Sequence, residues 1–129
     1  MGDVIKNLVA LTDFLRQHDH LAPTVANLRT AFGDLSVQVH PLGGSYSTHL
    51  SVLCAWGDAL GVDEAVVTAT ATSTESGCVH LKIRGRVGEA SAQVVAVVDV
   101  REHAALSTVG EDTLLPLSVL REAVSDVDA

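Results

Sequence analysis

Three residues of types that can do chemistry fall on two neighbouring predicted strands. Cys78 and His80 are two positions apart, so both point to the same side of one strand, and the predicted pairing places Asp99 opposite Cys78. A cysteine beside an imidazole and a carboxylate is an arrangement in which a thiolate can be activated. A flat sheet supplies neither a pocket nor an oxyanion site, however, and an alternating strand places polar residues there in any case. We therefore predict no catalytic residue.

The histidines raise the question of a metal site. His18 and His20 flank Asp19 just past the end of a predicted helix. A ligand set would need three or four converging residues, and a histidine after a helix end is also favoured by the helix dipole alone. The residues that could complete the set are His40, His49 and His103. The sequence therefore predicts no metal site and no cofactor.

The remaining motifs do not indicate a reaction. Cys54 lies near Trp56 in an apolar helical segment and is expected to be a small core residue. Two cysteines are too few for a disulfide scaffold and do not form a CxxC motif. The glycines match neither GxGxxG nor GxxxxGK[ST], and GxSxG is absent, so the loop at residues 43–45 is interpreted as a connector.

The composition indicates one globular domain. A length of 129 residues suits a single domain, and hydrophobic residues make up 47% of the chain against 19% charged residues. Only 3% of the residues are aromatic, so the core must be built mainly from aliphatic side chains. The net charge of −8 opposes the phosphate backbone of nucleic acids.

Three helices are predicted from apolar residues that recur every three or four positions. They cover residues 3–18, 48–60 and 114–125. Ser47 is the expected cap of the second helix and Gly61 its stop. Pro116 falls in the first turn of the third helix, where proline is tolerated, and residues 125–129 are expected to be frayed.

Residues 24–40 fit a β-hairpin. A two-residue turn at Gly33-Asp34 pairs Phe32 with Leu35 and puts the apolar side chains of both strands on one face. The polar side chains then share the other face. A helix over residues 24–32 is the alternative.

Residues 65–100 fit a three-stranded meander of alternating apolar and polar residues. A three-residue turn ending at Gly77 pairs Ala69 with Ile83. The second turn, at Gly88-Glu89, pairs Ile83 with Val94. One face of the meander is almost wholly apolar, and its small side chains would let a helix approach closely.

The predicted element order is α-β-β-α-β-β-β-α. Alternating strands are typical of an antiparallel sheet with one covered and one exposed face, whereas strands of a parallel sheet are continuously apolar. We therefore expect a single α+β domain over residues 1–129, in which an antiparallel sheet of about five strands carries the helices on one face. The order of the hairpin and the meander within the sheet is left open by the sequence.

The exposed face of the predicted sheet is the candidate interaction surface. It collects four of the eight lysines and arginines, whereas the acidic residues fall mostly on helices, turns and the tail. A mildly basic face on an acidic body is suited to docking another protein or a second copy of the chain. The simpler alternative is that long basic side chains solvate an exposed sheet. The predicted interaction residues are Arg29, Gln38, His40, His80, Lys82, Arg84, Arg86, Gln93, Val95 and Val97.

We expect a non-enzymatic accessory or regulatory protein that binds another protein or forms a homodimer. Two alternatives stay open. The first is a small-molecule binder or enzyme with a pocket between the sheet and the second helix, lined by Tyr46, His49 or Trp56. The second is a nucleic-acid binder that uses the basic sheet face, although that face carries no aromatic side chain on which bases could stack.

The sequence favours a cytoplasmic protein with no membrane partner. The first ten residues lack the basic region and long apolar run of a secretory signal, and no apolar stretch reaches the roughly 18 residues that a membrane span needs. Lys6 and Lys82 are the only lysines, among abundant alanine and valine. Such usage is associated with GC-rich bacterial genomes and their phages, so a bacterial or phage origin is expected.

Overall fold

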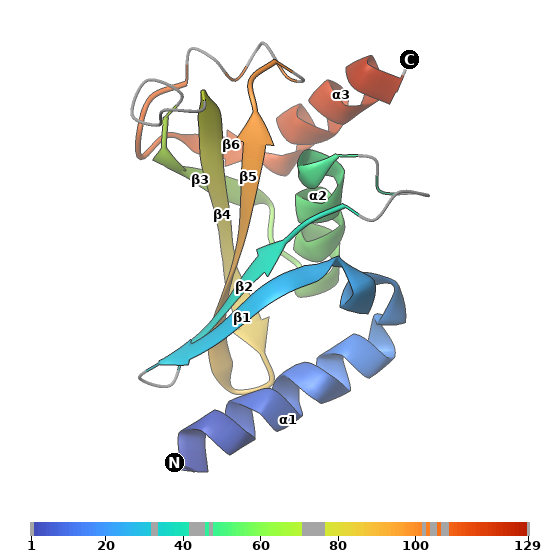
Figure 1. Ribbon diagram of the computed structural model, residues 1–129, viewed down its shortest axis with the longest axis vertical. Helices are drawn as coiled ribbons and strands as arrows, with labels where there is room; N and C mark the ends of the chain where they lie inside the picture. Colours follow the sequence, from blue (N-terminus) through green and yellow to red (C-terminus); the bar gives the residue numbers. More distant parts are fainter. Residues whose placement is uncertain are drawn as a thin grey trace.

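In the part of the chain that the structure describes, three α-helices and six strands form an α+β fold (Figure 1). The computed structural model describes residues 2–31, 34–41, 46, 48–70, 77–101, 103, 106 and 109–128. The helices are α1 (Gly2–Gln17), α2 (His49–Leu60) and α3 (Leu117–Asp128), with a 3-10 helix η1 (Asp19–Thr24) after α1. The strands are β1 (Val25–Ala31), β2 (Asp34–Val39), β3 (Glu64–Ala69), β4 (Cys78–Val87), β5 (Ala90–Asp99) and β6 (Leu114–Pro116).

The strands form one mixed sheet in the order β1-β2-β5-β4-β3-β6. The α+β class is confirmed, but the expectation of a purely antiparallel sheet is wrong because β2 pairs with β5 in parallel. A parallel pair needs a long crossover connection. Here the chain leaves β2, passes through α2 and returns along β3 and β4 before β5 reaches the side of β2.

The first hairpin is confirmed, but its predicted register is wrong by two residues. β1 pairs with β2 through Ala31 opposite Asp34 and Thr30 opposite Leu35, so Asp34 belongs to the strand and not to the turn. The two residues between the strands, Phe32 and Gly33, lie outside the described part of the chain. A shift of two positions preserves the face of every side chain, which is why the predicted apolar and polar faces are unaffected. The alternative of a helix over residues 24–32 is wrong.

The meander is also confirmed, with one register error. β4 and β5 pair as predicted, with Ile83 opposite Val94 across the tight turn at Gly88-Glu89. β3 and β4 do not pair as predicted, because Ala69 lies opposite His80 and not opposite Ile83. β3 ends at Ala69 and β4 begins at Cys78, so the connection is longer than the predicted three-residue turn, most of which falls outside the described residues.

The C-terminal segment differs from its prediction at one end. Leu114–Pro116 is not the first turn of a helix but the edge strand β6, which pairs with β3, and α3 begins only at Leu117. Proline has no N–H to contribute to a sheet, and an edge strand is where this is tolerated. With this extra strand the sheet has six strands, and not the predicted five.

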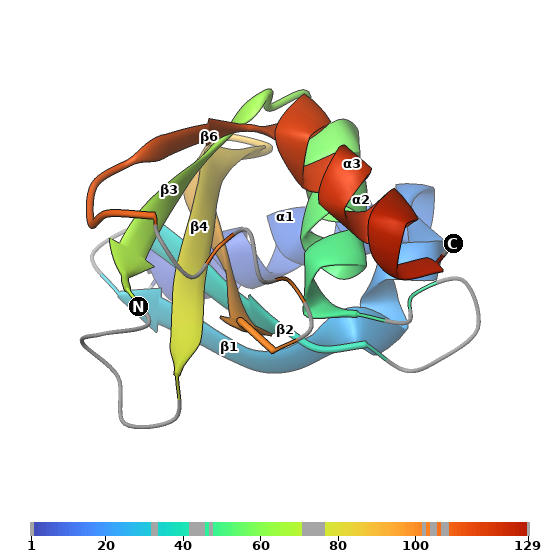
Figure 2. The same cartoon turned by 90° about the horizontal axis from the view of Figure 1, so that it is seen from above.

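Helix α2 fills the concave side of the curved sheet, and α3 packs against α2 (Figure 2). The cap of α2 is Thr48, whose side chain accepts from the N–H of Ser51, while the Ser51 hydroxyl accepts from the N–H of Thr48. Gly61 ends the helix with a φ of 69°, a conformation that favours glycine. The core is centred on α2 and the inward-facing strand residues and extends to Leu21 of η1 and to Leu117 and Leu120 of α3. Its residues at most 1% exposed include Leu50, Leu53, Trp56, Leu35, Val37, Leu81, Ile83, Val94 and Ala96.

Helix α1 lies across the end of the sheet, beside the turn between β4 and β5 (Figure 1). A Cβ atom at Gly88, which has a φ of 62°, would lie 3.2 Å from the Cβ of Ala10, so helix and turn approach closely. Only a narrow strip of α1 is buried, at Asn7 and Leu11. The outward side of this helix is therefore open.

Candidate functional site

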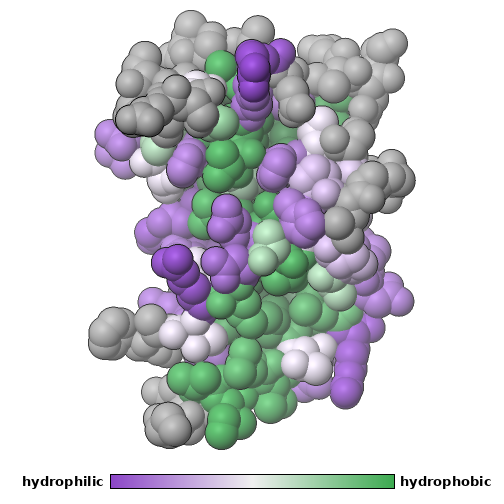
Figure 3. Space-filling view, in the orientation of Figure 1, coloured by the Kyte–Doolittle hydropathy of each residue, from purple (hydrophilic) through white to green (hydrophobic). Residues whose placement is uncertain are grey.

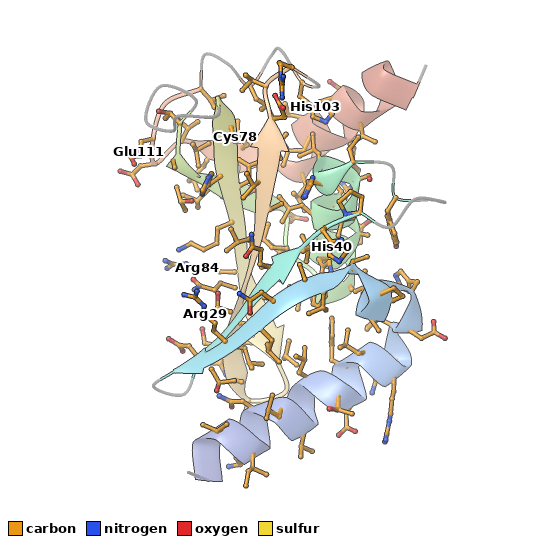
Figure 4. The ribbon with its side chains drawn as sticks, in the orientation of Figure 1. Arg29, His40, Cys78, Arg84, His103 and Glu111 are labelled. Carbon is orange, nitrogen blue, oxygen red and sulfur yellow. The ribbon has the colours of Figure 1, made fainter. Side chains whose placement is uncertain are left out.

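The parallel contact between β2 and β5 joins the polar faces of the hairpin and the meander into one surface. Residues lie opposite one another in rows that cross the sheet, and the row Arg29–Ser36–Gln93–Arg84 crosses β1, β2, β5 and β4. The neighbouring row crosses all six strands through Asn27, Gln38, Val95, Lys82, Val66 and Leu114. We call the surface formed by these two rows, with His80, Val97, Arg86 and Ser91, the open face. Arg29 and Arg84 project from it to the same side of the sheet (Figure 4).

A shallow recess of about 250 Å³ lies in the open face and is formed by four strands. Val95 and Val97, both half-buried, contribute apolar surface to it. Its polar lining residues are Asn27, Arg29, Ser36, Gln38 and His80. None of the residues that line the recess is acidic, so its hydrogen-bonding groups are mainly donors around one guanidinium.

The lysines and arginines fall into two groups of four. Among the described residues, each cation outside the open face has a carboxylate within 4.0 Å: Lys6 with Glu89, Arg16 with Asp13, Arg101 with Asp99 and Arg121 with Asp58. The open face carries the other four cations, Arg29, Lys82, Arg84 and Arg86. None of these four takes part in an ion pair among the described residues. Positive charge on the open face is therefore not neutralised by contacts within the described part of the chain.

Acidic residues are present near the margins of this surface. Asp34 lies opposite Ser91, which lies opposite Arg86 in the next strand. Glu64 precedes the buried Ala65 on β3 and by alternation shares the side of the open face. The sequence pattern places Asp34 in a turn and predicts neither Asp34 nor Glu64 on this face.

The predicted interaction residues divide by position. The recess brings together Arg29, Gln38, His80, Val95 and Val97. Lys82, Arg84, Arg86 and Gln93 extend along the same face outside it. His40 follows the end of β2, where its N–H donates to the carbonyl of Thr24 (2.8 Å), and it does not line the recess.

Five residues of this surface, one of them Ser91 of β5, were not among the predicted interaction residues. Asn27 and Ser36 line the recess, and the strand alternation that selects Arg29 and Gln38 also selects them. Val66 and Leu114 add apolar side chains at the β3 and β6 end of the row that crosses six strands. Leu114 is 58% exposed. The sequence does not indicate that Leu114 belongs to a strand, because a leucine pair before a proline also fits the start of a helix.

In the candidate catalytic group, an arginine binds the carboxylate. Cys78 lies opposite Asp99 as predicted. The Asp99 carboxylate, however, accepts hydrogen bonds from the Arg101 guanidinium (2.6–3.1 Å) and from the Arg101 backbone N–H (2.8 Å). These hydrogen bonds lower the pKa of Asp99 to about 2. Asp99 is therefore held as an ionised partner of Arg101.

Cys54 is a core residue, as expected. It is 6% exposed and belongs to the hydrophobic core. Burial raises its pKa to about 11, an effect that the nearby Arg121 opposes and Asp58 reinforces. The Cys54 thiol is consequently protonated at neutral pH and is a poor nucleophile.

The predicted metal and pocket alternatives find no assembled site in the described residues. No group of three histidine, cysteine, aspartate or glutamate residues converges there on one point, and the rings of His18 and His20 are 6.1 Å apart. The interface between α2 and the sheet is packed with buried side chains. Trp56 is fully buried, and its indole N–H donates to the hydroxyl of Thr24. Tyr46 lines a recess of about 410 Å³ with His18, His20 and residues of α2, but no described residue of the sheet lines it, and it is therefore not the pocket between α2 and the sheet that the sequence left open.

Comparison with protein-family models, with curated proteins and with solved structures finds no match to this chain. Among the described residues, no helix has both the length and the apolar character that crossing a membrane requires. The open face therefore has to be interpreted from its own chemistry.

Proposed function

We propose that this chain is a non-enzymatic accessory protein whose open face binds an acidic segment of another protein. The observation that carries this proposal is the division of the cations. Four are paired with carboxylates elsewhere, whereas the four on the open face have no ion pair among the described residues. A surface with uncompensated charge on a chain of net charge −8 is suited to a partner of opposite sign.

The recess fits one carboxylate side chain of such a partner. The Arg29 guanidinium can donate two parallel hydrogen bonds to a carboxylate, and the amides of Asn27 and Gln38 offer further donors. Val95 and Val97 would contact the methylene groups of a glutamate. The volume of about 250 Å³ lies below the roughly 300–1,000 Å³ of typical small-molecule sites. A side chain therefore suits the recess better than a cofactor does.

The acidic remainder of the chain would orient the partner. An acidic segment is repelled by most of the surface and attracted only where Lys82, Arg84 and Arg86 lie. Long-range attraction of this kind raises the association rate and weakens as salt is added. The proposal includes action in the cytoplasm and a bacterial or phage origin, which rest on the sequence alone.

A matched pair of charge-reversed variants tests the proposal. The first variant is Lys82→Glu/Arg84→Glu/Arg86→Glu, and the control is Lys6→Glu/Arg16→Glu/Arg121→Glu, which has the same net charge. Proteins captured from the native host by the unchanged chain should be lost with the first variant and kept with the control. Equal capture by the unchanged chain, the first variant and the control would contradict the proposal.

Single-stranded nucleic acid is the competing partner in this test. It has less support because none of the residues of the open face, as defined above, is aromatic, and base stacking is a main source of affinity for single strands. Salt-sensitive binding of labelled single-stranded DNA or RNA that the first variant loses and the control keeps would replace the protein partner by a nucleic acid.

A further inference from the structure

A second surface, separate from the open face, lies on the outward side of α1. Four apolar residues of this helix are exposed: Val4 (40%), Ile5 (64%), Leu8 (38%) and Val9 (54%). They are most of the large apolar side chains that the described part of the chain exposes. Figure 3 shows apolar surface at the end of the molecule where α1 lies. The helix is held to the domain by its other side, through the buried Asn7 and Leu11 and the half-buried Ala10, Phe14 and Leu15, so packing within the chain does not account for the exposure of Ile5 and Val9.

The sequence of α1 is complementary to itself when it is read in the opposite direction. Between Asp3 and Arg16, each residue of the first half falls opposite one of matching character in the second half, whereas the end residues Gly2 and Gln17 do not match. The pairs are Asp3 with Arg16, Val4 with Leu15, Ile5 with Phe14, Lys6 with Asp13, Asn7 with Thr12, Leu8 with Leu11 and Val9 with Ala10. The four charged residues of α1 are matched by opposite charge, the apolar residues by apolar ones and Asn7 by Thr12, whereas Gln17 falls opposite Gly2. Asn7 and Leu11 are buried against the domain, so the matched charges that a contact surface can use are those of the exposed Lys6 and Asp13.

We propose that α1 is the contact surface of a homodimer, in which it packs antiparallel against α1 of a second copy. A two-fold axis between Val9 and Ala10 places Lys6 at the height of the partner's Asp13, and Asp13 at the height of the partner's Lys6. Such an axis also keeps each flank of one helix beside the same flank of the other. Lys6 and Asp13 lie on one flank of the outward surface and Leu8 on the opposite flank, with Ile5 and Val9 between them.

The charged residues of α1 can be drawn into this contact at little cost. Lys6 lies 3.7 Å from Glu89, and Arg16 lies 4.0 Å from Asp13. The side chains of both pairs are 62–91% exposed. Exposed pairs of this kind contribute little to stability, so exchanging them for contacts with the partner is not opposed by the fold.

A groove beside α1 gives the second helix room to approach. It has a volume of about 800 Å³ and runs between α1 and the turn of β4 and β5. Val9, Ala10 and Phe14 line it with apolar atoms, and Lys6 and Asp13 lie along it. A helix of 16 residues is about 24 Å long. A contact of this length belongs to the small interfaces, so the dimer should dissociate on dilution.

Two single charge reversals and their mixture test this arrangement. Lys6→Glu places a glutamate at the height of the partner's Asp13, and Asp13→Lys places a lysine at the height of the partner's Lys6. Each reversal turns two attractive pairs into repulsive ones and should raise the dissociation constant of the homodimer about tenfold, or about 1.4 kcal/mol. Mixed in equal amounts, the two variants form complementary pairs at both positions and should dimerise again.

Solution mass by light scattering across a range of concentrations is the measurement. The unchanged chain should approach twice its monomer mass of 13.5 kDa, each single variant should stay near 13.5 kDa, and the mixture should recover the larger mass. Circular dichroism melting of each variant verifies that the fold is kept, and Lys82→Glu on the open face should leave the dimer unchanged. A mass of 13.5 kDa for the unchanged chain at every concentration overturns the proposal, and so does a dimer that both reversals leave intact or a mixture that stays monomeric.

Discussion

Gln38 of β2 lies opposite Val95 of β5, in the parallel pair that joins the N-terminal hairpin to the meander. Without this pair the polar residues of the two units would lie on separate surfaces. With it, Arg29 and Gln38 from the hairpin line the same recess as His80 and Val97 from the meander. The open face is therefore a product of long-range pairing between segments far apart in the sequence.

The buried hydrogen bond between Trp56 and Thr24 should contribute measurably to stability. The Trp56 indole nitrogen lies 2.9 Å from the Thr24 hydroxyl oxygen, and both residues are at most 1% exposed. Thr24→Val leaves the buried indole N–H without an acceptor and should lower the free energy of unfolding by about 1–3 kcal/mol. Urea unfolding followed by Trp56 fluorescence measures this loss. Thr12→Val, at an exposed site on α1, should change the free energy by less than about 0.5 kcal/mol.

Asp99 should titrate far below an ordinary aspartate. Its hydrogen bonds to Arg101 lower its pKa to about 2. Because the folded pKa is depressed, this pair stabilises the fold above the unfolded pKa near 4, and the contribution is lost as pH falls from there through about 2. Carboxyl chemical shifts measured by NMR between pH 5 and pH 1.5 give the pKa. In Arg101→Gln it should return towards its usual range, and an unchanged value would show that Arg101 is not the cause.

The Cys54 thiol should be protected from alkylation in the native protein. Burial raises its pKa to about 11, so little thiolate is present at pH 8. Cys78→Ser removes the other cysteine and lets Cys54 be followed alone by mass spectrometry after treatment with iodoacetamide. Native protein should stay unlabelled, while protein in denaturant should gain one label. Rapid labelling without denaturant would mean that the thiol is accessible and would contradict its place in the core.

Truncation of a buried core side chain should lower the free energy of unfolding far more than truncation of an exposed side chain on the open face. Leu53 of α2 is fully buried against the sheet, and Leu53→Ala should lower the free energy of unfolding by about 2–5 kcal/mol. Arg84→Ala, on the exposed side of β4, should change it by less than about 0.5 kcal/mol. Chemical denaturation of both variants tests the difference. A large loss in Arg84→Ala would indicate that the open face is needed for folding and is not reserved for binding.

Local signals predicted most of the secondary structure, and the errors concern strand register and the pairing of strands distant in sequence. The register of β4 and β5 was predictable because a tight turn at Gly88-Glu89 fixes it within a few residues. The register of β3 and β4 was not, because the chain between Ala69 and Cys78 is long enough to permit several pairings. The parallel pairing of β2 with β5 leaves no trace in either strand, since both alternate as antiparallel strands do.

The candidate surface was predictable only in part for the same reason. Strand alternation places Arg84 and His80 on the exposed side whichever strands are neighbours. Arg29 lies on the same surface as Arg84 and His80 only because β2 lies beside β5. The sequence left this strand order open. The exposed apolar side of α1 is not predictable from the sequence, because an amphipathic pattern indicates apolar residues that face the core, whereas Ile5 and Val9 face outward in the structure.

The most direct test of the open face is an NMR titration of the isotopically labelled chain with an oligoglutamate peptide at low salt, with oligolysine as the control peptide. We predict saturable shifts of backbone amides centred on Arg29, Gln38, Arg84 and Val95, which fade as salt is added and are absent in Lys82→Glu/Arg84→Glu/Arg86→Glu. Shifts that are absent at low salt, or that fall on the helices and spare these strands, would contradict it.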